Sequence, residues 1–147
     1  MVIRKAQAAW EGNLEKGQGT MELGAGGLEV PYSFGSRFED GAGATPEGLI
    51  GAAHAGCFSM ALAHELGEAG HPPVRVATTA KVHLEKSGDG FAIPKIELDT
   101  EADVPGVDDA TFQRIARAAK QGCPVSKVLS VADITLNAKL LSSQERT

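Results

Sequence analysis

The chain has 147 residues, of which 42% are hydrophobic and 22% charged, a balance typical of a folded globular protein rather than a disordered tail. This length suits one domain with a sizeable core. The formal net charge is −5 and Lys and Arg form no run, which argues against a nucleic-acid-binding protein.

The N-terminal region does not have the pattern of a secretory signal, because charged side chains interrupt its first twenty positions, at Lys5, Glu11, Glu15 and Lys16. The longest uncharged stretch, 48–64, contains three glycines and two histidines. It is too short and too polar for a membrane span, which needs about 20 apolar residues. We therefore expect a cytoplasmic protein without a membrane partner, in which a disulfide would be transient and chemical.

The first part of the chain, 1–40, predicts a β-meander. Runs at 2–10 and 20–23 favour short strands separated by Gly-rich turns. Apolar and polar residues then alternate over 28–39, which is typical of a half-buried strand. Pro31 indicates that this third strand lies at an edge of the sheet.

A long central helix follows, from about residue 45 to 69. Thr45 can cap it, Pro46 suits the first helical position, and Glu47 is favoured in the first turn. Gly70 should end it. Its apolar residues extend nearly all the way round, so the helix should be buried on most sides.

The second half predicts a β-hairpin, a second helix at about 108–121 and a final strand near residues 134–140. The hairpin turn falls at 87–90, and Pro94 should make the returning strand irregular. The whole chain, 1–147, is thus predicted to be a single α+β domain with antiparallel strands. So small a chain can hardly cover a helix on every side, and we infer a tight homodimer.

The chain has two cysteines, Cys57 and Cys123, which do not form a Cys-x-x-Cys pair. A single cysteine on an apolar helix is usually an unreactive buried side chain. The helix dipole acts mainly in the first turn, and Cys57 lies beyond that turn. Burial should therefore raise the pKa of Cys57. A reactive Cys57 therefore needs a cation that stays charged when desolvated, which is a property of Arg.

Arg37 is the leading candidate for this cation, although strand periodicity alone would place it on a solvated face. An alternative role for Glu47 is only to complement the helix dipole, and about 15 Å along its own helix separates it from Cys57. It would have to act through Arg37 or across a subunit boundary. Cys123 follows a helix-ending Gly122, in a loop with some freedom to move.

Three segments resemble the OsmC/Ohr family of peroxidases. Residues 46–62 (PEGLIGAAHAGCFSMAL) resemble its central-helix signature, 122–126 (GCPVS) its second-cysteine signature and 36–39 (SRFE) its arginine strand. The resemblance extends to about residue 141 with the same order of elements. The form His-Ala-x-Cys-Phe-Ser-Met points to the OsmC branch rather than to Ohr.

The resemblance implies that Cys57 is the peroxidatic thiolate, which attacks a peroxide oxygen, releases an alcohol and becomes a sulfenic acid. Cys123 would resolve that acid as a disulfide. Arg37 would keep Cys57 ionised and stabilise the leaving alkoxide, and Glu47 would orient Arg37 through a bidentate pair.

The resemblance also implies partners: an organic hydroperoxide, a dithiol reductant of the dihydrolipoyl type and a second copy in an intertwined homodimer. It implies neither a cofactor nor a metal. Apolar walls, for which Phe38, Phe58 and Met60 are candidates, would favour alkyl hydroperoxides over hydrogen peroxide. No role is assigned to His64, His71 or His83.

Three other interpretations stay open. A metal site could use His54 and Cys57, which share a helical face, with Cys123, His64 or His83. A cysteine hydrolase could use His54 as the base for Cys57, although no nucleophile elbow is present. The chain could also be a non-catalytic binding or structural protein.

Overall fold

The computed structural model describes residues 1–24, 26–39, 43–142 and 145. The chain forms two compact units, Met1–Leu49 and Ile50–Thr147. Residue 40, the expected end of the meander, lies outside the described residues. No helix in the described part of the chain combines the length and the apolar character that crossing a bilayer requires.

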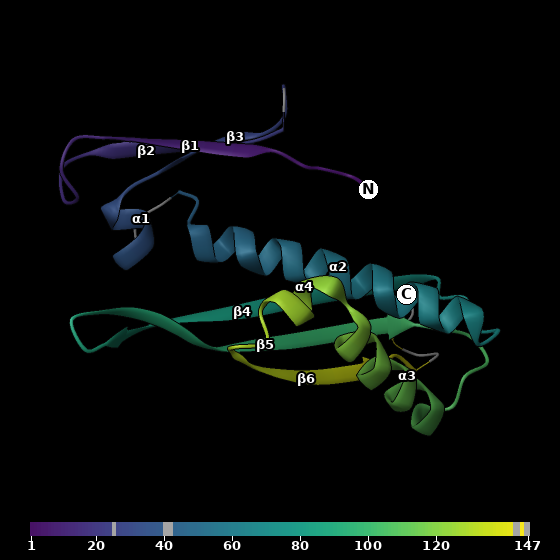
Figure 1. Ribbon diagram of the computed structural model, residues 1–147. Coiled ribbons are helices and arrows are strands. Elements are labelled where there is room, and N and C mark those ends of the chain that lie inside the picture. Colours follow the sequence, from purple (N-terminus) through teal and green to yellow (C-terminus); the bar gives the residue numbers. More distant parts are fainter. Residues whose placement is uncertain (25, 40–42, 143–144, 146–147) are drawn as a thin grey trace. The chain divides into compact units, whose positions relative to one another are not determined.

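The first unit contains the predicted meander. Strands β1 (Ala6–Glu11), β2 (Gln18–Leu23) and β3 (Glu29–Tyr32) form an antiparallel sheet in the order β1-β2-β3 (Figure 1). The rings of Trp10 and Tyr32 lie 5.4 Å apart. A Cβ at Gly19 would come within 2.7 Å of Trp10 and 2.6 Å of Tyr32, so a larger residue here would displace these rings.

The strand predicted over 28–39 is only partly correct. It ends at Tyr32, and Phe34–Phe38 forms a short helix, α1. The backbone N–H of Ser36 donates to Ser33 Oγ at 3.1 Å, and that of Ser33 donates to Ser36 Oγ at 2.9 Å. This capping box satisfies the first helical N–H groups and outweighs the alternating pattern. Arg37 therefore lies on a helix, not on a strand.

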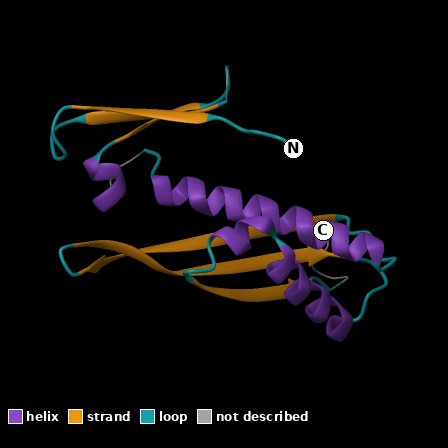
Figure 2. Cartoon of the chain, viewed as in Figure 1, coloured by secondary structure: helices purple, strands orange, loops and turns teal. Residues whose placement is uncertain are grey.

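The second unit contains a three-stranded sheet in the order β4 (Arg75–Ser87), β5 (Gly90–Asp103), β6 (Asp133–Leu140), shown in orange in Figure 2. β4 and β5 form the predicted hairpin, and their register shifts between His83 and Glu85, across from the expected irregularity at Pro94. β6 is parallel to β5, which corrects the expectation of purely antiparallel strands. A parallel pair needs a crossover connection, and α3 (Asp109–Gly122) and α4 (Pro124–Val128) supply it.

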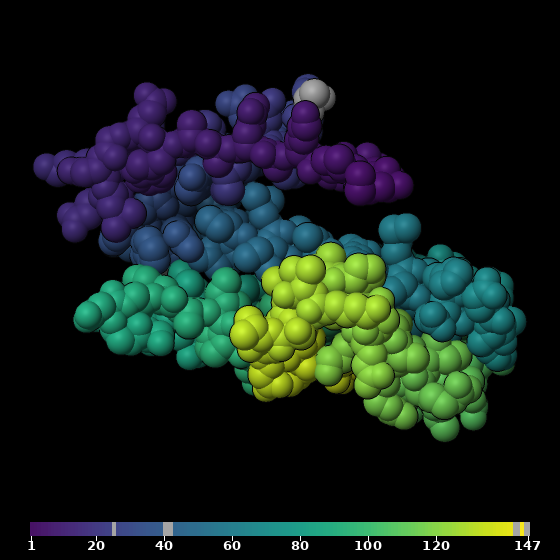
Figure 3. Space-filling model, in the orientation of Figure 1, coloured from purple at the N-terminus to yellow at the C-terminus, as the bar shows by residue number. Residues whose placement is uncertain are grey.

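Helices cover one face of this sheet. α2 (Pro46–Glu68) and α3 lie within one residue of their predicted limits, 45–69 and 108–121. Figure 3 shows α3 and α4 packed together in green and yellow-green. The core consists of alternate β5 residues and the inner sides of the helices: Phe58, Leu62, Leu66, Ile96, Leu98, Ala102, Val104, Phe112, Ile115, Ala116, Ala119, Cys123 and Ala132. From Lys95 to Asp103 the intervening β5 residues are polar, so this part of the other face carries charge.

Helix α2 is not buried all round within a single chain. One side is fully buried through His54, Phe58, Leu62 and Leu66. On another side Gly56 is exposed, and Met60 has 78% of its surface exposed. This is the apolar side that the sequence predicts a second subunit to cover.

Candidate active site

The two cysteines lie in contact within the second unit. Cys57 is in the middle of α2, and Cys123 joins α3 to α4 as the C-cap of one and the N-cap of the other. Both are free thiols, and Cys123 Sγ donates a hydrogen bond to Cys57 Sγ at 2.8 Å. Because a disulfide has a sulfur–sulfur distance of about 2.05 Å, a shift of about 1 Å would join them.

The surroundings of Cys123 differ from those expected. Its exposed surface is 0%, and the chain turns directly from one helix into the next at this residue, so it does not lie in a mobile loop. Its burial does not separate it from Cys57, which is only partly exposed itself. The fold therefore brings the two sulfurs together without a loop movement.

The two sulfurs differ in electrostatics. Burial raises the pKa of Cys57, the hydrogen bond with Cys123 raises it further, and a hydrogen bond from the Val125 backbone only partly compensates. Burial also disfavours the Cys123 thiolate, but hydrogen bonds from Cys57, from the backbone and side chain of Ser126 and from Val125 outweigh this and lower its pKa. The pKa values of the two thiols therefore shift in opposite directions. Ionisation of Cys57 needs the additional cation that the sequence predicts.

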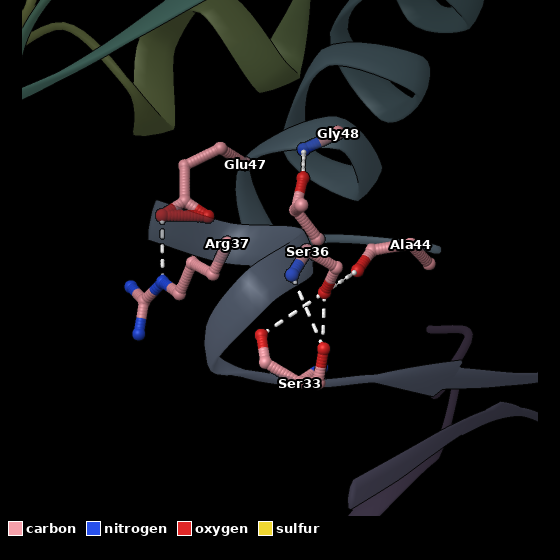
Figure 4. Close-up of polar contacts among 7 residues, drawn as sticks. Ser33, Ser36, Arg37, Ala44, Glu47 and Gly48 are labelled. Atoms are coloured by element: carbon pink, nitrogen blue, oxygen red, sulfur yellow. Dashed lines mark hydrogen bonds and ion pairs between the residues drawn. The ribbon is translucent and has the colours of Figure 1, made fainter. Parts of the chain in front are cut away.

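The first unit holds the predicted Arg–Glu pair. Arg37 Nε donates to Glu47 Oε1 at 2.8 Å, and the side chains are 38% and 9% exposed. The pair has one hydrogen bond rather than the expected two, and Glu47 Oε2 has no hydrogen-bond partner among the described residues. In Figure 4 the two terminal nitrogens of Arg37 point away from Glu47.

A serine network holds the helix that carries Arg37. Ser36 Oγ lies 2.9 Å from the Ala44 carbonyl oxygen and 3.0 Å from that of Ser33, so these two acceptors share its single hydrogen (Figure 4). The backbone N–H of Gly48 donates to Thr45 Oγ1 at 2.9 Å, which confirms Thr45 as the cap of α2. These bonds fix α1 beside the first turn of α2, where Glu47 lies.

A buried histidine reaches the cysteine pair through a residue that the sequence did not single out. His54 is fully buried, and its Nε2 lies 2.7 Å from Ser126 Oγ. A hydrogen bond from the Ser126 side chain in turn helps to lower the pKa of Cys123. The available signal was the second-cysteine signature, 122–126 (GCPVS), which contains Ser126.

Residues 39–139 match the family model described as OsmC-like protein. The chain belongs to the OsmC family. It is 54% identical over 142 residues to Peroxiredoxin OsmC of Escherichia coli strain K12, covering 96% of this chain and 99% of that one. It is 33% identical to an organic hydroperoxide resistance protein-like protein of Mycoplasma pneumoniae, over 65% of this chain and 69% of the relative.

Solved structures of OsmC and Ohr proteins share the fold. An organic hydroperoxide resistance protein OsmC from Legionella pneumophila has a TM-score of 0.71 at 21% identity, covering 95% of this chain and 99% of its own. OhrB of Bacillus subtilis has a TM-score of 0.63 at 24% identity, covering 93% and 98%. These similarities establish the α+β fold.

The first unit of this OsmC-family chain has an aromatic groove beside Arg37. Its volume is about 360 Å³, and its lining comprises Trp10, Gly12, Leu14, Tyr32, Ser33, Phe34, Arg37 and Phe38. Of the three predicted wall residues, Phe38 lies here, Phe58 is 0% exposed in the core of the second unit, and Met60 is on the exposed side of α2. Sequence periodicity could not identify Trp10 or Phe34 as neighbours of Arg37, because α1 was read as a strand.

The rival sites find little support in the OsmC-family structure. Within the described residues, no group of three or more His, Cys, Asp or Glu side chains is placed to hold a metal ion. His83 pairs with Glu97 at 2.8 Å. His54 Nε2 contacts Ser126 and not Cys57, so it is not placed as the base of a Cys57 hydrolase.

Proposed function

We propose that this protein is a thiol-dependent peroxidase that reduces organic hydroperoxides to alcohols, with Cys57 as the peroxidatic and Cys123 as the resolving cysteine. The observation that carries the proposal is the 2.8 Å contact between two sulfurs far apart in the sequence, of which Cys123 is buried in the apolar core and Cys57 packs against it. The name of the 54% identical relative, Peroxiredoxin OsmC, agrees with it.

In the first step the Cys57 thiolate attacks the terminal oxygen of ROOH. A sulfur–oxygen bond forms, the O–O bond breaks, and the alkoxide takes a proton and leaves as ROH. Cys57 is oxidised by two electrons to a sulfenic acid, and the peroxide is reduced by the same two.

In the second step the Cys123 sulfur attacks the sulfur of the Cys57 sulfenic acid. The disulfide forms, and the hydroxide that leaves is protonated to water. The close contact of the two thiols makes this step intramolecular, which favours it over attack by a second peroxide molecule.

Arg37 supplies the positive charge that the first step requires. Burial raises the pKa of Cys57, so its thiolate must be stabilised, and a guanidinium stays charged when desolvated. Glu47 orients Arg37 through Nε and leaves the terminal nitrogens for the thiolate and the developing alkoxide.

The substrate class follows from the groove beside Arg37. Its aromatic lining binds an alkyl or aryl group better than a second hydroxyl group, so organic hydroperoxides are preferred to hydrogen peroxide.

A dithiol of the dihydrolipoyl type reduces the disulfide in the cytoplasm. A second copy of the chain covers the exposed side of α2 in a homodimer, and light scattering that finds only a monomer at micromolar concentration would contradict this part.

Peroxide consumption with a dithiol reductant tests the function. Cys57→Ser should abolish turnover, because no sulfur remains to be oxidised first. Cys123→Ser should still consume about one equivalent of hydroperoxide but lose clean recycling. Normal multi-turnover activity of the Cys57 variant would refute the assignment, and stoichiometric zinc in the purified protein would favour the metal-site interpretation.

A further inference from the structure

Behind the cysteine pair lies a buried chain of polar groups that the proposed reaction does not use. His54 comes from α2, three residues before Cys57, and Ser126 comes from α4, three residues after Cys123. The imidazole Nε2 is 2.7 Å from Ser126 Oγ. Ser126 lies three positions after Cys123, and a hydrogen bond from its side chain helps to lower the pKa of the Cys123 thiol. Both residues are buried, with 0% and 6% of their surface exposed.

Only a few protonation states are possible for these buried polar groups. Burial lowers the pKa of His54, so the imidazole is neutral and has one N–H. With that hydrogen on Nε2, His54 donates to Ser126 Oγ, and the single hydroxyl hydrogen of Ser126 is left to point at Cys123. This pattern stabilises a thiolate at Cys123, since a hydrogen bond to the charged form favours ionisation.

The other imidazole nitrogen argues against a purely structural histidine. His54 Nδ1 is buried and has no hydrogen-bond partner within the described part of the chain. A buried polar atom without a partner destabilises a fold, and an apolar side chain of similar size would fill this place without that cost. The imidazole is therefore better explained by what Nε2 does at Ser126.

We propose that the Ser126 hydroxyl stabilises the thiolate of Cys123, and that His54 is a positioning residue that holds the Ser126 hydrogen toward this sulfur. The inference rests on the proposed function and concerns only its second half. It makes Cys123 both the attacking thiolate when the disulfide forms and the leaving thiolate when the disulfide is reduced.

Both steps balance. During resolution the Cys123 thiolate forms the S–S bond, the S–O bond of the Cys57 sulfenic acid breaks, and the hydroxide takes the proton that Cys123 gave up. During recycling a dithiol thiolate attacks the Cys57 sulfur, the S–S bond breaks, and Cys123 leaves with the electron pair and a hydrogen bond from Ser126. The second thiol of the reductant then closes its own disulfide and releases Cys57. A lower pKa of the leaving thiol accelerates such exchange.

The first test measures the thiol pKa of Cys123 in a Cys57→Ser background, where Cys123 is the only thiol, by the pH dependence of thiolate absorbance or of alkylation. Ser126→Ala should raise this pKa by about one unit, the size expected for a lost hydrogen bond to a charged group. Ser126→Thr should restore it, because the hydroxyl is kept. His54→Phe should raise it less, because Ser126 remains. Ser130→Ala, an exposed serine just beyond α4, is the matched control.

The second test follows disulfide formation in the two-cysteine protein after a single addition of an alkyl hydroperoxide. Ser126→Ala should slow the appearance of the disulfide roughly three- to tenfold, because less thiolate is present at neutral pH. Circular dichroism checks that each variant is folded, and His54→Phe replaces Ser126→Ala if the latter is not.

A Cys123 pKa in Ser126→Ala equal to that in Ser130→Ala overturns the inference, and so does an equal rise in Ser126→Ala and Ser126→Thr. Failure of the proposed function gives a different result. In that case the unsubstituted protein itself forms no sulfenic acid or disulfide with the hydroperoxide.

Discussion

Each of the two compact units is stabilised internally by a different kind of interaction. Among the described residues, every core hydrophobic side chain lies in Ile50–Thr147, from Phe58 to Ala132. In Met1–Leu49 the buried residues that the structure describes are Gly19, Ser36 and Glu47, which are small or polar. Apolar packing therefore positions the two sulfurs, whereas hydrogen bonds position the guanidinium of Arg37. Substitutions in the core of Ile50–Thr147 should mainly reduce stability, and substitutions around Arg37 in Met1–Leu49 should mainly reduce activity.

The largest effect on stability is expected in the core of the second unit. Phe112 is 0% exposed, so Phe112→Ala should lower the free energy of unfolding by about 3–5 kcal/mol, as measured by urea denaturation. Phe34 in the first unit is only partly buried and packs against Phe38 at 5.1 Å, so Phe34→Ala should cost about half as much or less. Equal losses of unfolding free energy in the two variants would contradict this difference between the two units.

The reverse is expected at Arg37. Arg37→Met should reduce peroxidase kcat/KM by about 100-fold, because a preorganised positive charge is lost. It should lower the melting temperature less than Phe112→Ala does, because the ion pair that it breaks is partly exposed at Arg37. Arg37→Lys should recover only part of the activity, because an ammonium group cannot hold Glu47 and an anion in the same fork geometry. Arg117→Met removes an exposed charge from α3 and serves as the control. A large stability loss with unchanged activity in Arg37→Met would contradict the assignment.

A smaller effect should follow from loosening the helix that carries Arg37. Ser36→Ala removes one half of the capping box and the bond to the Ala44 carbonyl, which should cost about 1 kcal/mol of stability. Activity should fall less than in Arg37→Met, because the guanidinium remains. Thermal unfolding and initial rates check both statements, and activity below that of Arg37→Met would show that Ser36 acts in some other way.

The smallest effect is expected at a second ion pair, which contrasts with Arg37–Glu47. Hydrogen bonds from Lys139 and then from the Ser142 backbone lower the pKa of Glu145 to about 2, but the pair is on the surface. A lowered pKa contributes stability above the ordinary value of 4.5, and this contribution is lost as the pH falls toward 2. Because solvent screens an exposed pair, Glu145→Gln should leave the melting temperature at neutral pH within error. A clear drop in melting temperature at pH 7 would show that this exposed ion pair contributes to stability, contrary to our expectation.

The sequence predicted those elements whose signals are local. Thr45, Pro46 and Gly70 mark the ends of α2, and the glycines at 88 and 90 mark the hairpin. The α1 helix escaped prediction because Phe34, Ser36 and Phe38 also fit a strand, and side chains bonding back to the backbone decide between the two.

Contacts between distant segments were harder to predict. The family signatures gave both cysteines, but the burial of Cys123 depends on packing between α2, α3 and α4. The parallel pairing of β6 depends on how the crossover returns to the sheet. No local pattern links Ser126 to its partner His54, because the two residues are 72 positions apart. Hydrogen bonds of this kind are visible only in the folded chain.

The most direct test is mass spectrometry of the non-reduced protein after one equivalent of an alkyl hydroperoxide. The 2.8 Å contact predicts an intramolecular Cys57–Cys123 crosslink, seen as one linked peptide pair and the loss of two hydrogens. If Cys57 instead accumulates as sulfinic acid, or Cys123 remains a free thiol, the two sulfurs do not act as a redox pair and the account is wrong.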